Sequence, residues 1–438
     1  MTESSPLREI NERTVKRCWL HVGMHKTGTT SLQVNLAKMK KTVGWRYIKV
    51  GGRANMGKAL CAMFASNPQN HSAFDKLGIP LEEIIVEGEK LKKKLRKAIL
   101  KTKQETIIIS AEALSVAIDK KGIVALKEFL EPLCEEIRVI GYVRPPLGFK
   151  ISIFQEAVKH GKSVFDIADR KVHYRKRFKK FDEVFGRENV ILRKFDPANF
   201  SHHCIVADFC EQIGIEGPAR SDIERTNESL TREACGLLFA YRKFGPGYGI
   251  GEDVIKENSR IIAPLFGISG SKLKVSKALL KSALGAERRD IGWMEKRIGS
   301  LLREKITDDG TEVSVEEDLL MIKRSTCEEY AANFANIHGD PIPVNKIPST
   351  DPVDPRDVAI FVEYCRTRCR KMIMADRARE SSWIFKYSRL VERWCNRLKA
   401  ISGLGVFAAA KGKNPRSKKT SKNASLNRQR SYRIPPSK

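Results

Sequence analysis

Short apolar runs alternate with longer amphipathic segments along the first half of the chain. Continuous runs of four to seven apolar residues are typical of strands that are buried on both faces. Strands are predicted at residues 18–22, 45–50, 106–110, 137–143 and 189–193. Helices are predicted at 30–41, 81–103, 121–135, from the Pro145-Pro146 pair to about 160, and at 204–213. This alternation predicts an α/β fold in which helices flank a parallel sheet on both faces.

The second half of the chain has a mainly helical pattern. It begins near residue 230, is interrupted by a glycine-rich loop at 244–251, and ends in one or two arginine-rich helices over 356–400. Large apolar residues are almost absent after 411, so the end of the chain is predicted to be a disordered basic tail. The expected organisation is an N-terminal arm at 1–16, an α/β domain with a helical continuation at 17–345, a helical extension at 346–410, and the tail at 411–438.

The charge balance favours anionic partners. The 438 residues carry a formal net charge of +29, and 41% of them are hydrophobic, which is enough for a sizeable core. The tail holds ten Lys or Arg and no Asp or Glu, so contact with an anionic surface is one expected role for it. Its one aromatic residue, Tyr432, does not favour stacking on nucleic-acid bases.

Cysteine spacing and hydropathy point to the cytoplasm. The ten cysteines are scattered and form no C-x-x-C pair, which is typical of reduced thiols rather than of a zinc site. The first residues are polar and lack the apolar core of a signal peptide. No apolar run approaches the roughly 20 residues that a membrane-spanning helix needs. A cytoplasmic protein without a transmembrane segment is therefore expected.

The loop after the first predicted strand has the spacing of a phosphate-binding loop. Residues 23–31 read GMHKTGTTS, so Gly23, Gly28 and Thr30 match the pattern G-x-x-x-x-G-K-[ST]. Thr29 stands where that pattern has lysine, and the lysine lies earlier in the loop, as Lys26.

A glycine turn between a strand and a helix can hold a phosphate through its backbone N–H groups and the helix N-terminus. Hydroxyl groups could add donors at Thr27, Thr29, Thr30 and Ser31. The alternative is a glycine turn that binds nothing.

A second loop follows the predicted strand at 137–143. Arg144 ends that strand, and Ser152 lies eight residues further on, about two helical turns later. Guanidinium presents a planar fork of donors, so this pair could converge on one phosphate. The alternative is an arginine that caps a strand beside an unrelated serine.

These two loops resemble those of the PAPS-dependent sulfotransferases, particularly bacterial members. The segment H-K-T-G-T-T-S resembles their 5′-phosphosulfate loop, and the arginine and serine eight residues apart resemble their 3′-phosphate site. Weaker resemblances lie at 207–214 and 225–230, and the whole resemblance covers about 16–235. Pro145 departs from the pattern, which usually has a polar residue there.

The resemblance implies a P-loop-type fold and transfer of a sulfuryl group from 3′-phosphoadenosine 5′-phosphosulfate (PAPS), with adenosine 3′,5′-bisphosphate as the product. Lys26 would then stabilise the leaving oxygen, Arg144 and Ser152 would hold the 3′-phosphate, and no metal is required. The 5′-phosphate would be held by Lys26, Thr27, Gly28, Thr29, Thr30 and Ser31.

Candidate general bases follow from their positions near these loops. Glu112 lies two residues past the third predicted strand, in a segment that resembles bacterial members, although it could also cap the next helix. His25 is the second candidate and His160 the third, and Gln155 is expected to line the acceptor cleft. The acceptor, a hydroxyl or amine on a glycan, another polysaccharide, a lipid or a small molecule, is not identified by any motif.

Two other classes of function compete with this interpretation. A P-loop kinase or NTPase would need a lysine in place of Thr29 and a magnesium-binding aspartate at a strand end, where the sequence has Ser110 and Arg144. A protein that binds an anionic surface or nucleic acid would act through its basic tail.

Overall fold

The computed structural model describes residues 15–39, 43–224, 229–304 and 311–401, without the side chains of 282 and 381–401. The chain divides into two compact units, Met1–Asp376 and Arg377–Lys438. The sheet and the residues that line the candidate site belong to the first unit. The predicted tail at 411–438 and most of the predicted N-terminal arm lie outside the described residues.

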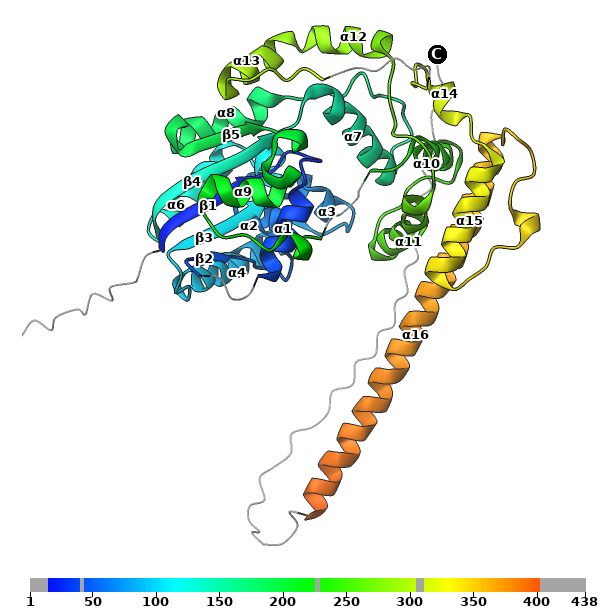
Figure 1. Ribbon diagram of the computed structural model, residues 1–438. Coiled ribbons are helices and arrows are strands. Elements are labelled where there is room, and N and C mark those ends of the chain that lie inside the picture. Colours follow the sequence, from blue (N-terminus) through cyan, green and yellow to red (C-terminus); the bar gives the residue numbers. More distant parts are fainter. Residues whose placement is uncertain (1–14, 40–42, 225–228, 305–310, 402–438) are drawn as a thin grey trace, which may run out of the picture. The chain divides into compact units, whose positions relative to one another are not determined.

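The core of the first unit is a five-stranded, fully parallel sheet (Figure 1). Its strands are β1 (Val15–Val22), β2 (Trp45–Tyr47), β3 (Thr106–Ala111), β4 (Cys134–Val143) and β5 (Val190–Lys194), in the order β2-β3-β1-β4-β5. β1 lies between β3 and β4, with Val22 opposite Ala111 and His21 opposite Ile140. The loops after three neighbouring strands therefore open at the same edge of the sheet.

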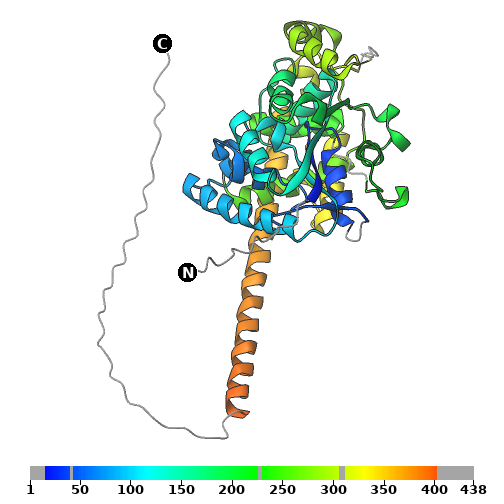
Figure 2. The ribbon, with the colours of Figure 1, turned by 90° about the vertical axis from the view of Figure 1, so that its left-hand side faces the viewer.

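Helices cover both faces of this sheet (Figures 1 and 2). Side chains alternate between the faces: Leu20 packs into one apolar cluster and Trp19 into another. One face is covered by α2 (Gly57–Phe64), α4 (Leu81–Leu100), α6 (Lys120–Leu130) and α8 (Tyr174–Phe185). The other is covered by α1 (Thr29–Lys38) and α9 (Ile205–Ile213). The predicted fold class is confirmed.

The second half is mainly helical, also as predicted. It contains α10 (Arg232–Phe244), α11 (Glu252–Ile262), α12 (Lys277–Ala286), α13 (Arg288–Ile298), α14 (Glu316–Leu320), α15 (Arg324–His338) and α16 (Pro355–Ile401). Helix α7 (Pro146–Lys159) joins the two halves, because Phe149 packs into the sheet core while Phe154 and Val158 pack into the helical core. This double packing fixes the helix that follows Arg144.

Helices in two stretches of the chain were not predicted from the sequence. Residues 51–80, where no helix or strand was predicted, contain α2 and the short α3 (Ser72–Asp75). α2 is short and buried on most sides, so it lacks the alternation of polar and apolar faces by which a helix is recognised in a sequence. No element was predicted at 161–188, where α8 lies. The arginine-rich stretch predicted as one or two helices is the single helix α16.

The described residues bear on two expectations, the state of the cysteines and the presence of a membrane-spanning helix. The nine cysteines with described side chains are free thiols, and eight of them are buried. Within the described ranges, every helix is too short or too polar to cross a membrane.

Candidate functional site

The loop after β1 has the backbone form of an anion-binding turn. Lys26 and Gly28 both have left-handed backbone conformations, with φ of 62° and 72°. Gly28 is the N-cap of α1, and a Cβ there would lie 2.9 Å from the Ile205 side chain, so only glycine fits without a shift. For Lys26 this conformation is strained, which is a frequent feature of functional loops. The turn presents N–H groups at the N-terminus of α1.

The hydroxyl groups of this loop are used unequally. The Thr27 hydroxyl donates to the Met24 carbonyl oxygen at 2.8 Å, and the Ser31 hydroxyl donates to the Glu224 carbonyl oxygen at 3.0 Å. Thr29 is also buried, whereas Thr30 is half-buried and lines the adjacent cleft. Backbone N–H groups, Lys26 and Thr30 are therefore the parts of this loop best placed to meet a ligand.

Glu112 lies at the end of β3, directly beside this loop. It is the N-cap residue of the one-turn helix α5 (Ala113–Val116), but its side chain makes no capping hydrogen bond. A Cβ on Gly23 would lie 2.9 Å from Cγ of Glu112, so the glycine permits this close approach. The Ser115 hydroxyl donates to the Gly23 carbonyl oxygen at 2.6 Å and joins the two segments. The geometry does not support the capping alternative for Glu112.

Arg144, at the end of β4, contacts the same loop. Its Nη1 donates a hydrogen bond to the Lys26 carbonyl oxygen, and its guanidinium lies 5.9 Å from the centre of the Phe195 ring. Burial lowers the pKa of Arg144. The two loops predicted to bind phosphate are thus in direct contact.

An anion already occupies the N-terminus of α7, next to Arg144. The Gly148 N–H group donates to both carboxylate oxygens of Glu304, at 3.1 and 3.0 Å. A Cβ on Gly148 would lie 2.8 Å from a Glu304 oxygen and 3.2 Å from Nε of Arg144, so all three groups lie close together. Burial raises the pKa of Glu304, although the hydrogen bonds and the Arg144 charge oppose this shift. Ser152 is buried two turns further along α7.

A cleft of about 940 Å³ adjoins the first loop. The sheet edge contributes His25, Lys26, Thr30 and Glu112, and α7 and its C-cap contribute Glu156, Lys159 and His160. Arg144 and Ser152 are not among its lining residues. The structure therefore brings Lys26, His25 and Glu112 together at the cleft and places Arg144 behind the loop.

Cationic groups converge on one carboxylate at this cleft. Glu156 Oε2 lies 2.9 Å from Nζ of Lys26 and 2.8 Å from Nζ of Lys159, and Oε1 lies 3.0 Å from Nε2 of His160. Burial would raise the pKa of Glu156, but the His160 hydrogen bond and the two lysine charges hold it well below its usual range. The local balance remains positive, which suits an anionic ligand.

His25 is uncharged at neutral pH. Burial and the Arg177 charge lower its pKa to about 4. Its Nδ1 is buried and has no hydrogen-bond partner among the described residues. A neutral imidazole can accept a proton, so His25 remains the alternative to Glu112 as the candidate general base.

Three charged residues at or near the cleft were not predicted from the sequence: Glu156, Lys159 and Arg177. Glu156 could have been found, because it lies four residues after Ser152 on the same helix. Gln155, expected to line an acceptor cleft, is not among the residues that line the cleft beside Lys26, and its buried amide donates to the Leu230 carbonyl oxygen at 3.0 Å. Among the described residues, no group of three or more His, Cys, Asp or Glu could hold a metal ion.

Comparisons with known proteins give a weak similarity. No family model and no curated protein matches the chain. Among solved structures, a sulfotransferase from Alicyclobacillus acidocaldarius is similar over 51% of this chain and 91% of its own. The sequence identity is 15% and the TM-score is 0.30, so this similarity carries no weight for the chemistry of the site.

Proposed function

We propose that this protein is a sulfotransferase that uses PAPS as its donor and transfers the sulfuryl group to a hydroxyl or amine. The observation that carries the proposal is the hydrogen bond from the Arg144 guanidinium to the Lys26 carbonyl oxygen. It joins two turns with anion-binding features that leave neighbouring strands, which is what a ligand with phosphates at two positions requires.

Each phosphate of the donor would have its own set of groups. Backbone N–H groups at 28–31, with Lys26 and Thr30, would hold the 5′-phosphate, whereas the Thr27 N–H donates to the Met24 carbonyl oxygen. Arg144 and the first N–H groups of α7 would hold the 3′-phosphate, with Ser152 as a further candidate. Glu304 supports this fit, because it shows that the N-terminus of α7 accepts an anion beside Arg144.

The chemistry assigned to the protein needs one cation and one base. In an in-line displacement, Lys26 would stabilise the negative charge on the phosphate oxygen as its bond to sulfur breaks. Glu112 would accept the proton of the acceptor group as the new bond to sulfur forms, with His25 as the alternative. Both side chains line the same cleft as Lys26.

Three expectations from the sequence stay predictions. They are the domain borders at 16/17, 345/346 and 410/411, the cytoplasmic location, and the contact of the tail with an anionic surface.

Ligand titration tests the proposed function. Isothermal titration calorimetry should show that adenosine 3′,5′-bisphosphate binds at least about tenfold more tightly than ATP, with or without magnesium, because only the former offers a 3′-phosphate to Arg144. Arg144→Ala should remove this preference. Arg144→Lys keeps the positive charge but lacks the planar fork of donors, so it should weaken the preference for the bisphosphate. Arg138→Ala, on the same strand but paired with Glu136, is the matched control and should bind normally.

Other outcomes point to the competing classes. Equal affinity for ATP with a requirement for magnesium would favour a kinase or NTPase. If folded protein does not bind the bisphosphate, the proposal is wrong. If removing residues 411–438 abolished every interaction of the protein, a tail-driven binding protein would be favoured.

A further inference from the structure

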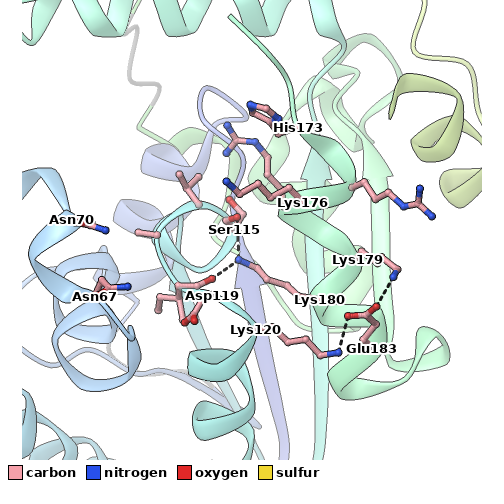
Figure 3. Close-up of a pocket in the computed structure, with 15 residues that line it drawn as sticks. Asn67, Asn70, Ser115, Asp119, Lys120, His173, Lys176, Lys179, Lys180 and Glu183 are labelled. Atoms are coloured by element: carbon pink, nitrogen blue, oxygen red, sulfur yellow. Dashed lines mark hydrogen bonds and ion pairs between the residues drawn. The ribbon is translucent and has the colours of Figure 1, made fainter. Parts of the chain in front are cut away.

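A second hollow, of about 550 Å³, lies between α5 and α8 (Figure 3). We call it the α5–α8 pocket. Six Lys or Arg side chains line it: Lys120, Arg175, Lys176, Arg177, Lys179 and Lys180. Two carboxylates, Asp119 and Glu183, line it as well, so its formal charge is strongly positive. Such a concentration of one sign in a concave site attracts anions.

Only part of this positive charge is neutralised within the protein. Glu183 pairs with Lys120 at 3.0 Å and with Lys179 at 2.6 Å. Arg175 and Lys176 are exposed, and neither forms an ion pair with a residue that the structure describes. These two side chains leave the rim of the pocket with free positive charge.

A buried arginine lines the same pocket. Arg177 is 9% exposed, its Nε donates to the Val172 carbonyl oxygen at 2.8 Å, and its guanidinium lies 5.2 Å from the centre of the Phe149 ring. Its Nη1 is buried without a hydrogen-bond partner among the described residues. An unpaired buried donor on a charged group is costly, and a ligand oxygen would satisfy it.

Lys180 adds a further buried positive charge to the wall. Its ammonium donates to the Ser115 carbonyl oxygen at 3.2 Å and to the Ile118 carbonyl oxygen, and Figure 3 shows it reaching from α8 toward this segment. Burial lowers its pKa to about 8, which leaves it mostly protonated at neutral pH.

The α5–α8 pocket adjoins the cleft that contains Lys26. Asn70, Val116 and Ala117 line both hollows. Glu112 precedes α5 and Val116 ends it, so one helical turn, about 6 Å, separates the candidate base from the rim of the pocket. A molecule with its reacting group beside Glu112 could therefore extend into the pocket.

We propose that the α5–α8 pocket binds an anionic substituent of the acceptor, a sulfate, phosphate or carboxylate group. This inference rests on the proposed function and makes the acceptor an acidic molecule. A neutral acceptor would leave Lys176 without an ion pair, Arg175 with only its contact to the Trp293 ring, and the Nη1 donor of Arg177 unpaired.

Binding of a defined probe tests the pocket. Fluorescence anisotropy at about 0.1 M salt should show that labelled dextran sulfate oligomers bind and that neutral dextran of equal length does not. The double variant R175E/K176E should weaken dextran sulfate binding by about tenfold or more, because it reverses two charges at the rim. Inorganic sulfate should compete far less well than the oligomer if the site serves a group carried on a larger molecule.

A matched control separates this pocket from the general positive charge of the protein. The control variant R46E/K49E makes the same two charge reversals at exposed positions, Arg46 on β2 and Lys49 just after it. β2 lies at one edge of the sheet, and β5, which α8 contacts, lies at the other. It should change the affinity by less than about twofold. Saturating adenosine 3′,5′-bisphosphate should leave the oligomer bound, because the two ligands use neighbouring sites.

The proposal is overturned if R175E/K176E binds like the wild type, if the control is weakened equally, if inorganic sulfate matches the oligomer, or if the bisphosphate displaces the oligomer. Titration of the bisphosphate into the same variants checks the donor site separately. If the bisphosphate binds normally while the pocket results fail, only the pocket proposal falls. If wild-type protein does not bind the bisphosphate, the proposed function falls, and with it the role of the pocket in acceptor binding.

Discussion

Glu304 places a carboxylate where the 3′-phosphate of the proposed donor would bind. Its oxygens accept hydrogen bonds from Gly148, beside Arg144. A phosphate at this position would have to displace the carboxylate or lie against it, and two like charges about 4 Å apart repel each other by about 1 kcal/mol even in bulk water. The affinity for the donor therefore includes the cost of moving this side chain.

Glu304→Gln should bind adenosine 3′,5′-bisphosphate about fivefold more tightly than the wild type at pH 8, because it removes the competing charge. The pKa of Glu304 is raised, so its carboxylate takes up a proton at a higher pH than an ordinary glutamate. The difference between the two proteins should shrink as the pH falls through that range. Calorimetric titrations at pH 8 and 5.5 measure both effects, and equal affinities at pH 8 would contradict the prediction.

Helix α7 is held in place by a buried ion pair with Glu287. Lys150 is fully buried and pairs with Glu287, the N-cap of α13, whose other carboxylate oxygen accepts the Val172 N–H group at 2.6 Å. This contact joins α7 to the entrance of α8 and to α13. The orientation of α7 in turn determines where Glu156 lies, since Glu156 is on this helix.

Lys150→Met should destabilise the protein by about 3–5 kcal/mol, because it leaves the Glu287 charge buried without its partner. K150M/E287Q should recover part of this loss. Urea denaturation measures both, with Lys92→Met as the control, since Lys92 forms a surface pair with Glu89 and should change stability by less than about 1 kcal/mol. If K150M unfolds like the control, the buried pair does not hold the helix.

The stability of the whole molecule should depend on a histidine inside the sheet. His21 is buried on β1, with its Nδ1 2.7 Å from the Ser110 hydroxyl oxygen. Burial lowers its pKa from 6.5 to about 3. The unfolded chain takes up a proton near pH 6.5 and the folded chain does not, so this contribution is full above pH 6.5 and is lost as the pH falls toward 3.

Between pH 7 and pH 4, His21 alone should lower the free energy of unfolding by about 3 kcal/mol. Urea denaturation of the wild type and of His21→Asn at several pH values checks this. The asparagine variant should show the shallower loss of stability with acid. Parallel curves for the two proteins would show that His21 does not titrate on unfolding.

Much of the fold was predictable from local pattern. Continuous apolar runs such as 106–110 predict buried strands because only a sheet covered on both faces keeps such residues from water. Helix α8 also carried a signal, since Tyr174, Phe178, Phe181 and Phe185 have helical spacing. Its inward-facing Arg177 and Lys180 obscured that signal, because buried charges are rare in sequence patterns.

The sequence by itself determined the parallel sheet, the glycine turn at Gly23–Gly28, and the positions of Lys26 and Arg144 at strand ends, because these depend on residues close together in the chain. Only the tertiary structure brought Glu304 to the N-terminus of α7 and Arg177 beside the cleft. Glu304 lies 156 positions from Gly148, and Arg177 lies 152 positions from His25, whose pKa its charge lowers, so both interactions depend on how helices pack. Charge and hydrogen bonding act over a few ångströms in space, so separation along the chain does not reveal which groups will meet.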